Sequence, residues 1–318
     1  MLRTLAHLII GYACVALLLA RSRGRERGSG MRAWRMLVLA AVAACRPGVA
    51  AKGQVLSVSE PAPGILVITT KAGNSIASVG PEGAVLVGIQ TPATTAAIEA
   101  ELAKRTKSPR RYVVLSPGDS TVVAGDAGWG ALGAITIAHE WNRPKLLDWS
   151  KLPGAPPMVI PPVTYSEVIA FDMNGESVHV VHMPAGYSND DAIVHFHHAG
   201  VIHLGGAFTT DGYPAVDFSQ NGSVDGMIDV VGRYLTSPER DRFVPVRGPI
   251  ATIAELKEYH AMLTQVRDRV RRLAKAGKSE AEVVAAKPTA SFDARWGRGP
   301  VSPDAFVRMV YNSKPEAK

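Results

Sequence analysis

The stretch that decides the fold begins with His182-Met-Pro-Ala-Gly-Tyr-Ser-Asn-Asp-Asp191 and continues as Ala192-Ile-Val-His-Phe-His-His-Ala-Gly-Val-Ile-His-Leu-Gly-Gly206. It predicts a loop, a strand, a tight turn at Ala199-Gly200 and a second strand, because apolar and β-branched residues flank a glycine-containing turn. Its density of His and Asp is typical of a metal site. A metallohydrolase is therefore the first hypothesis.

Strand and helix patterns surround this stretch in a repeated order. The predicted strands are 65–70, 75–79, 84–87, 111–115 and 134–138, followed by a hairpin of 168–172 and 177–181 turned at Asn174-Gly175. The predicted helices are 92–104, 223–235, 253–276, 279–286 and 302–311. Because strands followed by helices occur twice, we expect an α/β (α+β) αββα four-layer sandwich.

The N-terminus predicts export. We divide the chain into a leader and signal peptide, residues 1–51, and a single domain, residues 52–318. From Met31, which is a candidate true start, two arginines precede a short apolar run that ends in small residues. Three outcomes stay open, namely cleavage near Ala51, lipidation of Cys45, or an uncleaved anchor. Each predicts a periplasmic or secreted domain that touches a membrane only through the signal or a lipid.

The net charge of +7 is concentrated in the leader. Residues 1–52 hold nine Lys and Arg and one Glu, which leaves 26 basic and 27 acidic residues in the remainder of the chain. A nucleic-acid partner is therefore not expected, because such a partner needs a basic face on the folded domain. Both cysteines also precede residue 52, which excludes a disulfide and a cysteine-ligated metal from the domain.

Several segments between about residues 54 and 312 carry a resemblance to a known family. They are Asn74-Ser75, Gly83-Ala-Val-Leu-Val-Gly88, Ala134-Ile-Thr-Ile-Ala-His-Glu140, Pro184-Ala185 through Asp191, Val201-Ile-His-Leu-Gly205, Gly222-Ser-Val-Asp-Gly-Met227, Gly248-Pro249, Ala286-Lys-Pro288, Phe292-Asp-Ala-Arg-Trp-Gly297 and Asp304-Ala-Phe-Val-Arg308. Together they resemble a secreted branch of the metallo-β-lactamase-fold hydrolases. The Phe292 to Gly297 tail is the most specific of these segments.

The resemblance implies a two-zinc hydrolase, but the ligand positions carry other residues. Aligning the loop after Leu115 without a gap places non-His residues at three His positions and a Thr at the Asp position. The remaining three ligands, two His and a bridging Asp, also fall on other residue types. The seven former ligand positions are Pro117, Asp119, Thr121, Val122, Tyr187, Gly206 and Arg247. Of these, Asp119 is the residue that still suits a metal, and the Arg247 guanidinium opposes one because it stays positively charged.

These substitutions predict a protein without a metal cofactor and with no catalytic residues. We expect a non-catalytic pseudoenzyme with a binding or scaffold role, in which Asp119, Tyr187, Asn189 and Arg247 form a cleft for a small anionic ligand or a periplasmic protein. A second reading pairs Arg247 with Asp119 and leaves the cleft without a ligand.

An alternative function is hydrolysis of esters, lactones or amides, with zinc at relocated ligands or without a metal. The candidate relocated ligands are His182, His197 and His198. On one strand, however, His195 and His197 share a face and His198 points to the other. A zinc site needs three or four converging donors, and this spacing does not provide them within one element.

Overall fold

The computed structural model describes residues 55–88, 92–115, 130, 133–155 and 159–313. The leader and the segment 116–129 lie outside the described residues. These described residues belong to one compact unit. Within the described ranges, no helix is both long and apolar enough to cross a membrane.

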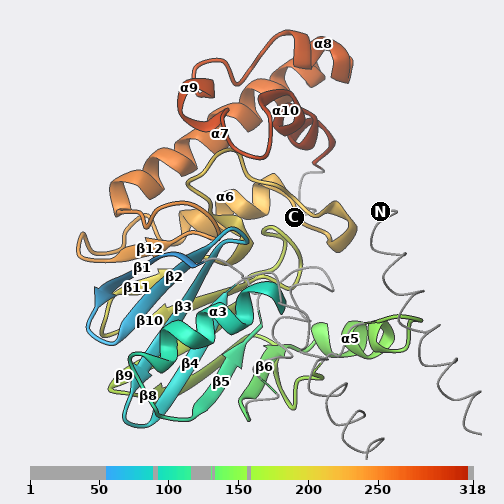
Figure 1. Cartoon of the computed structure of the whole chain (residues 1–318). Coiled ribbons are helices and arrows are strands. Elements are labelled where there is room, and N and C mark those ends of the chain that lie inside the picture. The colour runs from blue at the N-terminus through green and yellow to red at the C-terminus, as the bar shows by residue number, and fades with distance from the viewer. Residues whose placement is uncertain (1–54, 89–91, 116–129, 131–132, 156–158, 314–318) are drawn as a thin grey trace, which may run out of the picture. The chain divides into compact units, whose positions relative to one another are not determined.

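The first half of the domain forms a seven-stranded sheet in sequence order (Figure 1). Its strands are β1 (Val55–Ala62), β2 (Ile65–Thr70), β3 (Asn74–Gly80), β4 (Gly83–Gly88), β5 (Arg110–Val114), β6 (Ile135–His139) and β7 (Val163–Tyr165). Strands β1 to β4 are antiparallel, whereas β4 to β7 are parallel. The carboxyl ends of β4, β5, β6 and β7 therefore lie at one edge of the sheet.

The second sheet has five strands in the order β12-β11-β10-β9-β8. They are β8 (Val168–Met173), β9 (Glu176–His182), β10 (Ala192–Phe196), β11 (Val201–His203) and β12 (Arg242–Val244). The predicted hairpin is present, because β8 and β9 pair antiparallel. Both Asn174 and Gly175 have positive φ angles, 56° and 76°, as a type I′ turn requires. The decisive stretch forms β10 and β11 as predicted.

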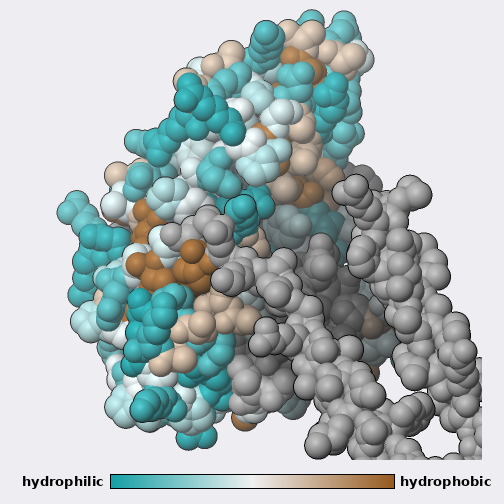
Figure 2. Space-filling view, in the orientation of Figure 1, coloured by the Kyte–Doolittle hydropathy of each residue, from teal (hydrophilic) through white to brown (hydrophobic). Residues whose placement is uncertain are grey.

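Helices cover the outer faces of both sheets. Helices α3 (Pro92–Ala103) and α5 (Asn142–Ser150) bury Ile98, Leu102 and Leu146 against the first sheet. The second sheet is covered by α6 (Val224–Gly232), α7 (Ile253–Lys275) and α10 (Pro303–Asn312), joined by the short α8 (Glu280–Ala285) and α9 (Asp293–Trp296) (Figure 1). Figure 2 shows mainly hydrophilic residues over the part formed by α7 and α8.

A third apolar layer joins the two sheets to each other. It includes Ile65, Val67 and Val85 of the first sheet and Val180, Val194 and Phe196 of the second sheet, all with at most 1% of their surface exposed. Since each strand alternates its side chains between two faces, each sheet contributes to two cores. The predicted αββα four-layer sandwich is confirmed.

Candidate functional site

Loops from both sheets meet at one edge, which we call the mouth and define by residues 139–141, 183–191, 204–206 and 245–248. Strands β9, β11 and β12 run in the same direction, so the residues that follow them emerge together. The Asn74 side chain, beside the end of β4, donates to the carbonyls of Pro245 and Gly248 at 2.9 Å each. On the other side, the rings of His139 and His182 stack with centroids 3.7 Å apart.

Among the predicted site residues, Tyr187, Asn189, Gly206 and Arg247 lie in the loops that form this edge. Tyr187 and Asn189 belong to the loop between β9 and β10, and Gly206 lies in the 3-10 turn η2 (Gly205–Ala207) after β11. Arg247 lies after β12. Pro117, Asp119, Thr121 and Val122 lie outside the described residues.

One buried carboxylate joins two of these loops. Asp191 Oδ2 accepts hydrogen bonds from the backbone N–H groups of Tyr187 at 2.6 Å and Ser188 at 3.4 Å, and its Oδ1 accepts one from Gly206 at 3.2 Å. Burial raises the pKa of Asp191 to about 7, against the three N–H donors, which lower it. Asp191 therefore fixes the backbone at positions 187 and 206 without using either side chain.

The Tyr187 side chain occupies the space above Gly206. A Cβ atom added at Gly206 would lie 2.5 Å from Tyr187 Cβ and 2.6 Å from Tyr187 Cγ, closer than non-bonded carbons approach. The half-buried ring also packs against the core formed with α6 and α7. A side chain at position 206 and the tyrosine at position 187 are therefore mutually exclusive in this arrangement.

Arg247 pairs with an acid that the sequence analysis did not name. Its Nε donates to Asp211 Oδ2 at 3.1 Å, and the Thr209 hydroxyl donates to Asp211 Oδ1 at 2.5 Å. Both partners of the ion pair are about one third exposed. The alternative pairing with Asp119 involves a position outside the described residues, and among the described residues the partner of Arg247 is Asp211.

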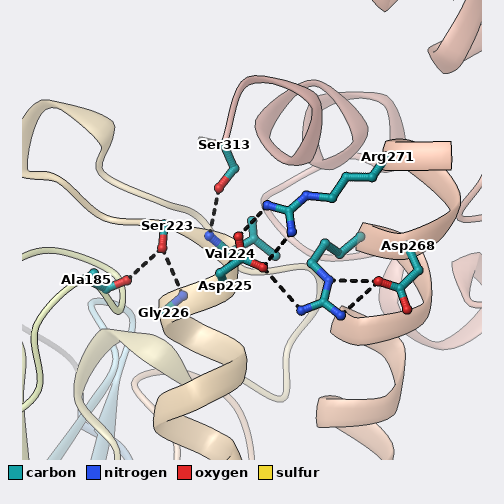
Figure 3. A network of polar contacts seen from close by, with 9 residues as sticks. Ala185, Ser223, Val224, Asp225, Gly226, Asp268, Arg271 and Ser313 are labelled. Carbon is teal, nitrogen blue, oxygen red and sulfur yellow. Dashed lines mark hydrogen bonds and ion pairs between the residues drawn. The ribbon is translucent and has the colours of Figure 1, made fainter. Parts of the chain in front are cut away.

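The N-terminus of α6 holds the 184–187 segment in place (Figure 3). Ser223 caps the helix, since its Oγ accepts from Gly226 N at 2.9 Å and donates to the Ala185 carbonyl at 3.2 Å. Val224 N donates to the Ser313 hydroxyl at 3.0 Å. A Cβ at Gly226 would lie 1.7 Å from the Ala185 carbonyl oxygen, so this close approach of loop and helix requires glycine.

A pocket of about 150 Å³ opens at the side of the mouth and shares Trp141, Asn189 and Asp190 with it. Its lining comes from three parts of the chain, namely Trp141, Lys145, Asn189, Asp190, Gln220 and Asn221. Lys145 Nζ forms an ion pair with Asp190 Oδ2 at 2.9 Å and a hydrogen bond with Gln220 Oε1. Asn189 is the pocket residue that the sequence analysis named.

Solved structures with the same arrangement of sheets and helices are found by structural comparison. An inverting sec-alkylsulfatase from Pseudomonas sp. aligns with a TM-score of 0.65 and 15% identity over 80% of this chain. This chain spans about half, 49%, of the length of that sulfatase. A metallo-β-lactamase from Pontibacter korlensis aligns with a TM-score of 0.55 and 16% identity, covering 66% of this chain and 99% of the lactamase.

The chain has the metallo-β-lactamase fold. No protein-family model and no curated protein matches the chain by sequence. The similarity therefore lies in the arrangement of the backbone, and the side chains at the mouth must be judged by their own chemistry.

The described mouth of this metallo-β-lactamase fold does not fit a metal. Gly206 has no side-chain donor, Arg247 brings a positive charge, and Tyr187 packs where a ligand at position 206 would stand. Across the described residues, no group of three or more His, Cys, Asp or Glu side chains is arranged to hold a metal ion.

Three histidines of the decisive stretch, His182, His195 and His197, belong to two groups in the structure. The rings of His195, in β10, and His197, directly after β10, stack at 3.8 Å, while His179 reaches His197 from β9 at 4.2 Å. His182 belongs to the other group, in which its Nε2 and that of His139 lie within hydrogen-bond distance of the carbonyls of Asn189 and Ser166. The contact from β9 could have been found from strand pairing, because His179 lies directly opposite His195.

The burial of His203 predicts a pH dependence for the stability of the domain. It is 1% exposed, and its Nε2 has no hydrogen-bond partner among the described residues. Burial lowers the pKa of His203 from 6.5 to about 4. The unfolded chain thus takes up this proton first, so the stability from His203 is present above pH 6.5 and is lost as pH falls toward 4. Asp191 has the opposite effect on the pH dependence of stability. Because its pKa is raised, its contribution to the free energy of unfolding falls as pH rises from 3.8 to about 7.

His203→Gln is expected to remove the first of these slopes. When the pH is lowered from 7.5 to 4.5, the free energy of unfolding of wild type should fall by about 2–3 kcal/mol more than that of the variant. Urea titrations at the two pH values measure the difference. His198→Gln, at an exposed position, serves as the control and should match wild type. A His203 variant that also matches wild type would show that this imidazole does not titrate with unfolding.

Proposed function

We propose that this chain is an exported protein of the metallo-β-lactamase fold that works without a metal and binds a ligand rather than catalysing hydrolysis. The observation that carries the proposal is the contact of Tyr187 with Gly206, because the Cβ and ring carbons of Tyr187 leave no room for a side chain at position 206. The backbone of both loops is nevertheless held in place by Asp191. A preserved frame with a changed site favours binding over metal-assisted chemistry.

The polar groups near the mouth also favour binding. Ser188 is fully buried and its hydroxyl donates to Asp190 at 2.6 Å, so it is unsuited to attack a substrate. The Nε2 atoms of His139 and His182 lie against backbone carbonyls. Ser188, His139 and His182 thus do not form a nucleophile with an adjacent free base.

Export is supported by the sequence of the leader and by the cysteine distribution. A charged segment, a short apolar run and small residues precede the domain, which lacks cysteine. We therefore place the domain in the periplasm or outside the cell, where its partner is a small molecule or another exported protein. Fractionation of cells that produce the full chain tests this placement, and a domain recovered with the cytoplasm would contradict it.

Metal content and hydrolysis test the function directly. We expect the purified protein to contain less than about 0.1 equivalent of zinc, iron or manganese, and added zinc should leave its Tm unchanged, because a ligand stabilises a fold only if it binds the folded state. Elemental analysis measures the metal content, and thermal unfolding measures the Tm with and without zinc. We also expect no turnover of an ester, a lactone, a β-lactam or a secondary alkyl sulfate. Stoichiometric metal whose removal abolishes turnover would overturn the proposal in favour of a hydrolase.

A double variant tests whether restoring two histidines is enough to restore metal binding. Tyr187→His combined with Arg247→His restores two imidazoles, but position 206 still has no donor. We expect this double variant to remain metal-free by elemental analysis after dialysis against zinc, since structural and catalytic zinc sites use at least three protein ligands. Tight zinc binding by the double variant would show that the residues outside the described ranges complete a site.

A further inference from the structure

The pocket beside the mouth joins three segments that are distant in sequence. Trp141 and Lys145 come from the start of α5, Asn189 and Asp190 from the loop before β10, and Gln220 and Asn221 from the 3-10 turn η3 (Phe218–Gln220) and the residue after it. Asn189 N donates to the Gln220 carbonyl at 2.8 Å, which joins two of these segments. The lining is therefore held by the fold rather than by one flexible loop.

An exposed but supported aromatic ring forms one wall. Trp141 has 48% of its surface exposed. Its ring meets His139 edge-on at 4.9 Å and His182 edge-on at 5.4 Å, so two imidazoles fix its position. An indole held in this way offers an apolar surface to a ligand with little loss of conformational entropy.

The charges in the pocket cancel. Lys145 Nζ is paired with Asp190, which is only 5% exposed and also accepts a hydrogen bond from Ser188. The Lys145 ammonium also donates to Gln220. Arg247, elsewhere at the mouth, is likewise compensated by Asp211. An anion would have to compete with these acids for the cations, whereas a neutral ligand would leave both ion pairs intact.

Carboxamides supply the remaining polar groups. Gln220 Nε2 donates to Asp217 Oδ2 at 2.8 Å, which orients that side chain. The side-chain amides of Asn189 and Asn221 make no hydrogen bond within the described part of the chain, and both line the pocket. Each carboxamide offers two donors and an acceptor, a combination that suits hydroxyl groups, which both donate and accept.

We propose that this pocket binds a neutral polyhydroxylated ligand with one sugar-sized ring. The C–H face of the ring packs on Trp141, and its hydroxyl groups form hydrogen bonds with Asn189 and Asn221. This inference rests on the binding role proposed above and names the class of ligand. The pocket, at about 150 Å³, is smaller than the roughly 300–1,000 Å³ of sites for drug-sized molecules, which favours a single ring.

The test uses small probes on the full-length protein. Saturation-transfer NMR and calorimetric titration are carried out with D-glucose, D-galactose, N-acetyl-D-glucosamine and myo-inositol, and with D-glucuronate as the anionic counterpart of glucose. We expect at least one neutral probe to bind with a Kd of about 1–10 mM, the range for ligands that gain a few contacts. Glucuronate is expected to bind no more tightly than glucose.

Three variants locate the binding. Trp141→Ala and Asn189→Ala should each weaken binding by about tenfold, or about 1.4 kcal/mol. Leu152→Ala is the matched control, because Leu152 is 58% exposed, follows α5 and does not line the pocket. It should retain wild-type affinity. Circular dichroism confirms that each variant is folded. Binding that survives both pocket substitutions, or that favours glucuronate by tenfold or more, would overturn the proposal.

The outcomes separate this inference from the proposed function. If no neutral probe binds at 100 mM while the protein is metal-free and inert, the sugar pocket is wrong and the metal-free role stands. If a probe binds in the Trp141-dependent way and a glycoside of it is cleaved in the NMR tube, the pocket stands and the non-catalytic role is wrong.

Discussion

Asp191→Ala is expected to lower the free energy of unfolding by about 3–5 kcal/mol, because it leaves three buried or half-buried backbone N–H groups without an acceptor. These groups belong to Tyr187, Ser188 and Gly206, on two loops that Asp191 joins. Asp191 itself is 2% exposed, so water cannot fully replace it. Asp191→Asn keeps one acceptor oxygen and should cost about half as much.

Urea unfolding at pH 8 measures this effect, since the carboxylate is mostly ionised above its pKa of about 7. Asp148→Ala is the control. It removes a carboxylate that is 75% exposed and pairs with Lys151 on the surface, so its cost should stay within about 0.5 kcal/mol. A cost below about 1 kcal/mol for Asp191→Ala would mean that the loops hold their shape without this carboxylate.

Gly206→Ala is expected to cost about 2–3 kcal/mol, because its methyl group would meet Tyr187 at 2.5–3.0 Å. The cost should fall to about 0.5 kcal/mol or less in a Tyr187→Gly background, where all three clashing carbons are absent. The coupling between the two positions would then be about 2 kcal/mol.

The four proteins of this cycle are compared by urea unfolding. Gly232→Ala provides the control, because its new Cβ has 3.4 Å of room and lies in a helix, where alanine is favoured over glycine. We expect that substitution to be neutral or stabilising. Equal costs of Gly206→Ala in both backgrounds would show that Tyr187 does not block position 206, and would remove the main support for the metal-free proposal.

Periodicity and capping made most of the architecture predictable. The long helix predicted at 253–276 is Ile253–Lys275, because Thr252 and Glu255 form a capping box and Gly277 follows its end. Helix α5 was missed, since Pro144 and three exposed polar residues hide its short apolar face. Strand β7 was also not predicted from the sequence, because three residues beside a proline-rich segment are too few to show an alternating hydrophobic pattern.

The contacts at the mouth could not be predicted from the sequence. Alignment of the motifs predicted that Tyr187, Gly206 and Arg247 belong to one site, and in the structure they follow β9, β11 and β12, which run in the same direction. Lys145 and Asp190, however, are 45 residues apart in sequence, and their pairing follows from how α5 lies against the loop before β10. Nothing in the local sequence distinguishes Lys145 from other surface lysines, so only the fold reveals the pocket.

The hydrogen bonds that Asp191 accepts affect which substitutions the mouth can accept during evolution. Because the carboxylate holds main-chain amides, substitutions at positions 187 and 206 need not reshape the loops. The two side chains still compete for one space, so a bulky residue cannot enter position 206 before the tyrosine has gone. Mutational paths toward an acid at position 206 therefore have a preferred order, with position 187 changing first, and paths away from such an acid have the reverse order.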